Sequence, residues 1–134
     1  MKKNSTFIIL VFTGMLAITS CKKDGYPAKP IPARTIQFTL YTEKDFSDDN
    51  HNITFSLFIR THTRTLFDST LSVMKIKDIP GAANKIVIEK KVPNDDGSDL
   101  AVGFNYTIEN VGISWHTDTC QAGNTFKIVN FAFQ

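Results

Sequence analysis

The sequence of 134 residues lacks several patterns that would place it in a common class of proteins. No stretch shows sustained helical spacing of apolar residues, which argues against a helical domain. No internal repeat is evident. The uncharged apolar run at 7–17 is too short to cross a hydrocarbon core, which needs about 20 residues. At this length, 42% hydrophobic residues suffice for one compact domain and no more.

The first twenty residues have the composition of an export signal. Lys2 and Lys3 give a positive start, and the apolar run at 7–17 follows directly. A positive segment, a short apolar core and small residues before a cleavage site are typical of secretory signal peptides. We therefore expect residues 1–20 to be cleaved and the remainder to be exported.

The residues at the expected cleavage site, Ile18-Thr19-Ser20-Cys21, resemble the lipobox of bacterial lipoproteins. In that family the signal is cut just before the cysteine, and lipid is attached to the thiol. The resemblance implies that Cys21 is acylated and that the lipid bilayer is a partner of the mature protein. Because each buried methylene contributes about 0.8 kcal/mol, two or three acyl chains make such an anchor long-lived.

Cysteine is scarce in the rest of the chain, where Cys120 is the only one. With Cys21 acylated, no intrachain disulfide can form. Excess positive charge is also missing, since loss of Lys2 and Lys3 from the 15 basic residues leaves 13, equal to the 13 acidic residues. Such a protein lacks the positive field that a phosphate backbone requires, so we expect no nucleic-acid partner.

Proline is concentrated at 22–33 (KKDGYPAKPIPA), which holds three of the five prolines. Proline-rich segments extend by about 3.1 Å per residue, which predicts a lipidated tether at 21–33 and a folded domain at 34–134. The chain resembles small lipoproteins of the Bacteroidota in its Cys-Lys-Lys-Asp start. It also shares the motifs Asp45-Phe46-Ser47, Asp68-Ser69, Lys77-Asp78-Ile79-Pro80 and Val102-Gly103-Phe104. The resemblance implies lipid anchoring at the outer membrane, on the periplasmic or the surface side, and no particular activity.

From Arg34 onward, apolar residues recur with period two, and the longest clean alternation lies at 100–108. This period indicates half-buried strands. The predicted strands are 36–41, 53–60, 65–68, 71–77, 85–92, 100–109, 112–117 and 125–133. In the last strand the phase slips between Ile128 and Val129, which predicts a β-bulge.

Eight short strands separated by polar turns favour an all-β fold, namely an antiparallel two-sheet β-sandwich with about 7–8 strands. The domain is immunoglobulin-like in size, although the disulfide and the tryptophan spacing of true immunoglobulin domains are absent. A small barrel is the alternative.

Two loops are rich in oxygen ligands. Glu43, Asp45, Asp48 and Asp49 crowd the first loop, and residues 94–99 (NDDGSD) form the second. Such loops can hold Ca²⁺, which takes six to eight oxygen ligands. The spacing matches no EF-hand loop, so we interpret the first loop as a solvated turn and the second as a hairpin turn. We expect no cofactor, with Ca²⁺ as the open possibility.

His116, Asp118 and Cys120 are candidate metal ligands, and Ser114 with the first two has the composition of a hydrolase site. Residues two apart on one strand project in parallel, about 6.6–7 Å apart, instead of converging into a relay. A zinc site needs three or four converging donors, which this segment does not supply by itself. We therefore expect no enzyme, with a small metal-dependent hydrolase as the weaker alternative.

Trp115, the only tryptophan, falls out of phase with its neighbours at 114 and 116. We expect its side of the strand to face the core, and an exposed aromatic contact site is the alternative.

These observations favour a membrane-tethered, non-enzymatic binding or structural module with a protein or glycan partner. The alternative is a calcium-stabilised carbohydrate-binding module. Trp115 and Tyr41 exposed on one flat surface would favour carbohydrate binding, whereas a concave site with His62, His116 and Cys120 would favour metal chemistry.

Overall fold

The computed structural model describes residues 30–134. The predicted signal peptide at 1–20, the predicted lipidation site Cys21 and the predicted tether as far as residue 29 lie outside the described residues. Among the residues that are described, no helix has the length and apolar character needed to cross a membrane.

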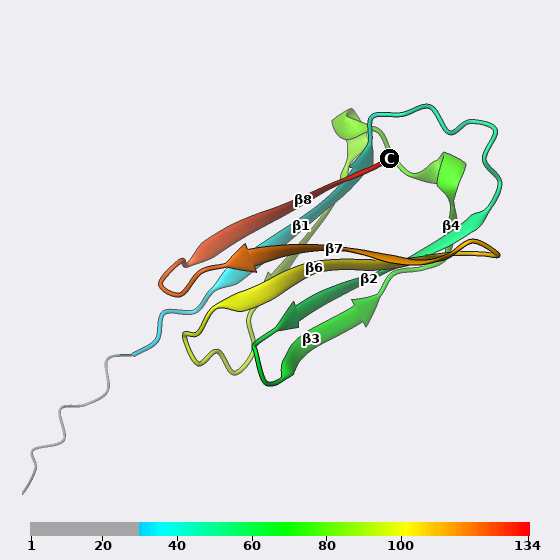
Figure 1. The fold of residues 1–134 in the computed structure, drawn as a ribbon. Coiled ribbons are helices and arrows are strands. Elements are labelled where there is room, and N and C mark those ends of the chain that lie inside the picture. Colours follow the sequence, from blue (N-terminus) through cyan, green and yellow to red (C-terminus); the bar gives the residue numbers. More distant parts are fainter. Residues whose placement is uncertain (1–29) are drawn as a thin grey trace, which may run out of the picture.

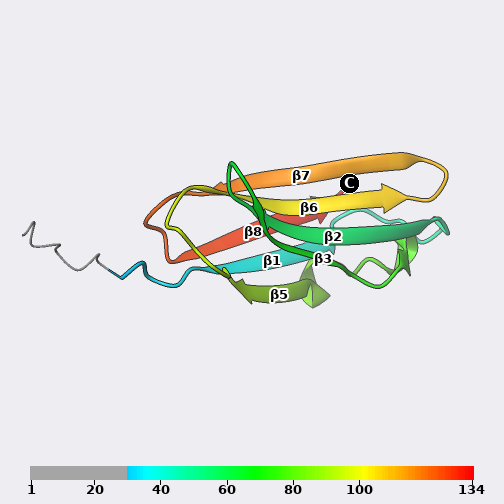
Figure 2. The ribbon, with the colours of Figure 1, turned by 90° about the horizontal axis from the view of Figure 1, so that it is seen from below.

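Two β-sheets pack face to face, which confirms the predicted β-sandwich (Figure 1, Figure 2). The smaller sheet has the order β5-β1-β8, and the larger has the order β3-β2-β6-β7 with β4 beside β2. The strand pairs are antiparallel except that β8 runs parallel to β1. The strands are β1 Thr35–Thr42, β2 Asn52–Arg60, β3 Thr65–Thr70, β4 Met74–Lys75, β5 Ile86–Lys91, β6 Leu100–Ile108, β7 Gly112–Cys120 and β8 Phe126–Phe133.

The strand order is that of an immunoglobulin-type sandwich with one change. In such domains one sheet contains neighbouring strands B and E, and the other can have the order C′-C-F-G. β1 and β5 match the B–E pair, and β3-β2-β6-β7 matches the second order. β8 lies beside β1 where strand A lies in those domains, but it comes from the end of the chain and runs parallel. The chain therefore enters the sandwich at the central strand of the smaller sheet.

The core lies between the sheets and is built from side chains that alternate along each strand. Phe38 of β1, Phe55 of β2 and Phe104 of β6 are each at most 1% exposed. Phe38 and Phe104 meet edge to face across the two sheets, with ring centroids 5.6 Å apart. Such aromatic pairs contribute about 0.5–1.5 kcal/mol beyond the burial of their area.

The predicted β-bulge in the last strand is wrong, because β8 pairs with β1 without a register shift. Val129 and Phe131 face the core, whereas Phe126 and Ile128 lie on the outer face and remain 48% and 44% exposed. Ile128 and Val129 are both apolar, so the sequence suggests that the alternation shifts by one residue between them. Hydrophobicity alone does not show that only Val129 is buried.

The strand predicted at 71–77 is largely replaced by other structure. Only β4 pairs with the start of β2, and two 3-10 helices follow, η1 at Ile76–Asp78 and η2 at Ala82–Asn84. Ile76 and Ile79 are 3% and 5% exposed. Residues three apart share one side of a 3-10 helix, so these two isoleucines hold the turn against the core.

Gly103 allows β6 and β7 to approach closely. A Cβ atom at this position would lie 1.9 Å from the carbonyl oxygen of His116, so the pairing requires glycine. Phe58 lies beside Gly103 on β2 and is only 3% exposed although it is on the outer face. The guanidinium of Arg60 lies over the Phe58 ring, 4.5 Å from its centroid. The Phe58 side chain thus covers the main chain of β6 at Gly103, which has no side chain of its own.

The two ends of the sandwich differ in what they carry. The described chain enters at one end, and the β1–β2 loop and the β6–β7 turn lie at the opposite end (Figure 1, Figure 2). We call that opposite end the distal end.

Candidate functional site

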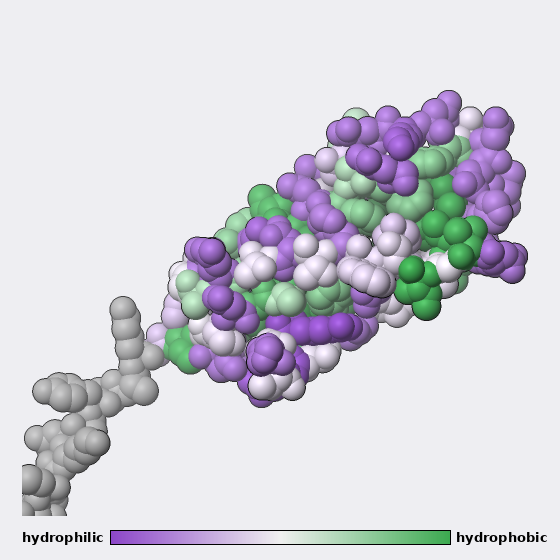
Figure 3. Space-filling view, in the orientation of Figure 1, coloured by the Kyte–Doolittle hydropathy of each residue, from purple (hydrophilic) through white to green (hydrophobic). Residues whose placement is uncertain are grey.

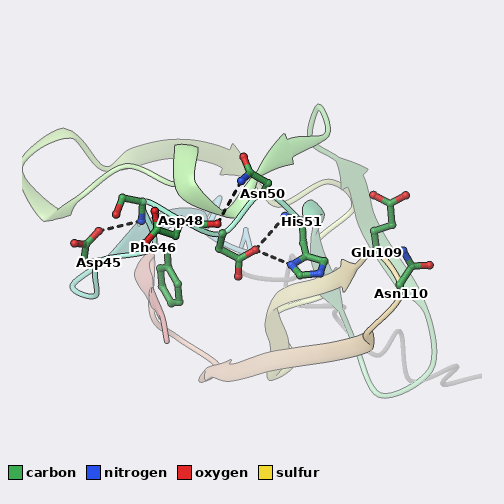
Figure 4. Close-up of a pocket in the computed structure, with 9 residues that line it drawn as sticks. Asp45, Phe46, Asp48, Asn50, His51, Glu109 and Asn110 are labelled. Carbon is green, nitrogen blue, oxygen red and sulfur yellow. Dashed lines mark hydrogen bonds and ion pairs between the residues drawn. The ribbon is translucent and has the colours of Figure 1, made fainter.

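A groove of about 740 Å³ lies at the distal end between the β1–β2 loop and the β6–β7 turn (Figure 4). It collects three of the four carboxylates that the sequence singles out in the first loop, namely Asp45, Asp48 and Asp49. Glu43 is exposed and does not line the groove. Glu109 from the β6–β7 turn completes the acidic lining. We call this feature the distal groove.

The carboxylates of the distal groove are largely occupied by local hydrogen bonds. Asp45 Oδ1 accepts the main-chain N–H of Ser47 at 3.0 Å, and this bond lowers the Asp45 pKa. Asp49 Oδ1 accepts the main-chain N–H of His51 at 3.0 Å and lies 2.8 Å from His51 Nδ1, which lowers the Asp49 pKa. These bonds shape the loop, as short polar side chains commonly do in turns.

No group of three or more histidine, cysteine, aspartate or glutamate side chains within residues 30–134 is arranged to hold a metal ion. In the distal groove, the carboxylate of Glu109 is also engaged, since its Oε2 accepts a bond from Asn52 Nδ2 at 2.8 Å. The distal groove is therefore a polar, acidic surface whose carboxylates bond mainly to neighbouring protein groups.

His116, Asp118 and Cys120 lie on the core side of β7, but each side chain has a different neighbour. The His116 ring stacks on Phe131 with centroids 5.0 Å apart. Asp118 Oδ2 lies 2.6 Å from Lys127 Nζ on β8, and this bond is the main reason that the Asp118 pKa is lowered. Cys120 is fully buried, and burial raises the pKa of its thiol. The three side chains do not form a shared site.

The second acidic loop connects β5 in one sheet with β6 in the other, so its interpretation as a hairpin turn is wrong. Its Asp95 forms a buried ion pair with Arg34, the residue just before β1, with exposed side-chain fractions of 7% and 2%. Arg34 Nε donates to Asp95 Oδ2 at 2.6 Å, and this interaction lowers the Asp95 pKa. Asp99 Oδ1 accepts the main-chain N–H of Ala122 at 2.6 Å. The loop thereby fixes the point where the chain enters the domain.

Trp115 does not face the core, contrary to the prediction. β7 pairs with β6 so that His116 lies opposite Phe104, on the core side, and Trp115 lies opposite Asn105, on the outer face. Trp115 is 70% exposed. The pairing with β6 decides which face of β7 is buried.

Trp115 begins a row of side chains that crosses the larger sheet. Its cross-strand neighbours are Asn105 on β6, Ser56 on β2 and Thr70 on β3. Ser56 Oγ and Thr70 Oγ1 are hydrogen-bonded at 2.8 Å. Strands lie about 4.8 Å apart, so this row spans about 14 Å. We call these four residues the Trp115 row, and none of them is charged.

An apolar stripe leads from the β6–β7 turn along β7. It consists of Val111, Ile113 and Trp115, which are 70%, 72% and 70% exposed. Strongly hydrophobic surface is visible at the end of the molecule away from the grey chain (Figure 3). Exposed groups of large apolar side chains mark interaction sites more often than isolated ones do. Tyr41 lies on β1 of the smaller sheet and does not share this surface.

Two features escaped the sequence interpretation. The Arg34–Asp95 pair joins residues 61 positions apart, and no local pattern signals it. Glu109 follows a strand in the sequence, but only the fold brings it to the β1–β2 loop. The residues of the apolar stripe alternate along the sequence, but the sequence interpretation placed the side of the strand that carries Trp115 toward the core. Comparisons of the chain with protein-family models, with curated proteins and with solved structures find no match.

Proposed function

We propose that the protein is a lipid-anchored module of the bacterial cell envelope that binds a partner without catalysing a reaction. The observation that carries this proposal is the apolar stripe of Val111, Ile113 and Trp115, which extends from the distal end along an edge strand. A small rigid sandwich on a tether suits the presentation of such a surface. The lipobox-like sequence at 18–21 supports attachment at the outer membrane.

Replacement of Cys21 by alanine is expected to move the protein from the membrane fraction to the soluble fraction and to abolish palmitate labelling. The reason is that Cys21 carries the only acyl chains in the proposed arrangement. Fractionation and radiolabelled palmitate measure the two effects. Cys120→Ala is the matched control. Cys120 is a buried free thiol, so its substitution is expected to leave both the fractionation and the palmitate labelling unchanged. An unlabelled wild-type protein, with unchanged fractionation of Cys21→Ala, contradicts the proposed anchor.

A photoreactive amino acid in place of Val111 is expected to cross-link the native envelope protein to its partner. Val111 is 70% exposed at the distal end, whereas Val87, 46% exposed on the outer face of the smaller sheet, is the matched control position. Cross-linked products are identified by mass spectrometry. Identical products from both positions, or none from position 111, argue against a binding surface at the distal end.

The second candidate function is binding of a neutral glycan, and the Trp115 row favours it. An exposed indole offers a flat apolar platform, and the amide and hydroxyl groups of the row can bond to sugar hydroxyls. Because Trp115 is the sole tryptophan, its fluorescence reports directly on this surface. Neutral envelope oligosaccharides are expected to shift its emission to shorter wavelength, and Asn105→Ala is expected to weaken the response. Emission that stays constant across such a panel removes this candidate.

A further inference from the structure

The edge of the larger sheet at β7 is open along the strand. β7 is the last strand in the order β3-β2-β6-β7, so its second side has no neighbour among residues 30–134. The main-chain N–H of Glu109 donates to the carbonyl of Asn52 at 2.9 Å, which fixes the alternation of hydrogen bonds along β6. Alternate residues of β6 bond to β2, and those between them, including Phe104 and Tyr106, bond to β7. On β7, the residues opposite these two are His116 and Ser114.

The main-chain groups of Ile113, Trp115 and Thr117 consequently point away from β6 toward the open edge. Thr119 has the same orientation, but its N–H donates to Asp118 Oδ1 at 2.6 Å and is therefore occupied. The free edge thus begins after the β6–β7 turn and ends before Thr119. Its apolar side chains, Ile113 and Trp115, are 72% and 70% exposed.

This edge lacks the features that usually prevent sheets from pairing at their edges. Such features are charged side chains, proline and bulges. The pairing of β7 with β6 has no register shift, and 112–117 contains neither proline nor a charged residue apart from the titratable His116. By contrast, the edge strand β5 carries Glu89, Lys90 and Lys91 within six residues. The nearest charge on β7, that of Asp118, is balanced by Lys127.

We propose that β7 pairs in antiparallel fashion with β7 of a second copy of this chain. A two-fold axis through Trp115 places Trp115 opposite its counterpart and Ile113 opposite Thr117 of the other copy. Every free main-chain group of the edge then finds a partner, in about six hydrogen bonds. No charge lies opposite a like charge in this register, and this self-complementarity favours a second copy over an unrelated strand.

The proposed pairing is compatible with the tether. The two-fold axis turns the entry points of the two chains toward opposite ends of the dimer. Residues 21–33 can span at most about 45 Å, since each residue extends by at most about 3.5 Å. Two such tethers can reach one bilayer from both ends of a dimer whose strands run along the membrane.

Cysteine cross-linking in the full-length protein within the native envelope tests the register. The proposed pair of position 113 and position 117 has a Cα separation of about 5.5 Å, within the range of a disulfide. Differently tagged Ile113→Cys and Thr117→Cys proteins are produced together and mildly oxidised. A disulfide-linked dimer is expected from the mixed pair, with at most about one tenth of that yield from either variant alone, because equal positions lie about 13 Å apart along the strands.

A lysine in place of Trp115 tests the same interface independently. Two lysines opposite one another, with loss of the tryptophan pair, are expected to reduce the mixed-pair yield about tenfold. Val87→Lys is the matched control and leaves the yield unchanged. Each of four outcomes overturns the proposal. They are the absence of a cross-link from the mixed pair, equal yields from the single variants, capture of a different protein at position 113, and an unchanged yield in W115K. These outcomes leave the palmitate labelling unaffected, and the proposed function is tested separately by capture at Val111 of a protein other than this chain.

Discussion

Asp95→Ala lowers the free energy of unfolding by about 3 kcal/mol, because removing one partner leaves the other charge buried and uncompensated. Arg34 is 2% exposed, and its Nη1 already lacks a hydrogen-bond partner within the described protein. The loss of Asp95 also removes the acceptor for the main-chain N–H of Gly97 at 2.9 Å. Urea unfolding followed by far-UV circular dichroism measures the change.

The double variant Arg34→Met/Asp95→Ala serves as the control for this effect. Replacing a buried ion pair by apolar groups of similar volume is often neutral or stabilising, so the double variant is expected to recover most of the loss. If the two single effects simply add in the double variant, the loss does not arise from an unpaired buried charge.

Phe131→Ala lowers the free energy of unfolding by about 3–5 kcal/mol, the usual cost of removing a buried phenylalanine side chain. The Phe131 ring lies 5.4 Å from Phe104, 5.5 Å from Tyr106 and 5.0 Å from His116, measured between ring centroids. It therefore joins β8 of the smaller sheet to both β6 and β7 of the larger sheet. The same denaturation measurement detects the effect.

Phe126→Ala is the matched control, since it removes the same side chain from the same strand on the outer face. Phe126 is 48% exposed, and its loss is expected to cost at most about 0.5 kcal/mol. The pair also tests the register of β8. A large loss from Phe126→Ala with a small loss from Phe131→Ala would mean that the opposite face of β8 is buried.

The positions of the strands were readable in the sequence because successive side chains of a strand alternate between a buried and a solvated face. β2 and β6 illustrate this, since Phe55 and Phe104 occupy the apolar phase of clean alternations and are buried. Helical layers were excluded because the domain has no sustained run of apolar residues at the three- to four-residue spacing of an amphipathic helix. The polar turns and the number of strands then favoured two packed sheets.

Alternation failed where both phases contain apolar residues. Ile128 and Val129 are both apolar, yet only Val129 is buried, because pairing with β1 fixes the orientation of β8. Likewise, Trp115 and His116 are both compatible with burial, and pairing with β6 turns the tryptophan outward. Hydrophobicity indicates which side chains can be buried. The pairing of the strand with its neighbours determines which of its two faces is buried.

The candidate site was only partly predictable. The acidic β1–β2 loop could be identified, because Asp45, Asp48 and Asp49 are close in sequence. Its completion by Glu109 could not be identified, because that contact depends on how the strands are ordered.

The sequence by itself determined the strand periodicity and the all-β class, since both follow from the order of neighbouring residues. Export and lipidation remain predictions from the same local order. Only the tertiary structure decided the parallel pairing of β8 with β1, the ion pair between Arg34 and Asp95 and the exposure of Trp115. The physical reason is that these features depend on contacts between distant segments. Such contacts are selected by the packing of the whole sandwich and not by the residues on either side of them.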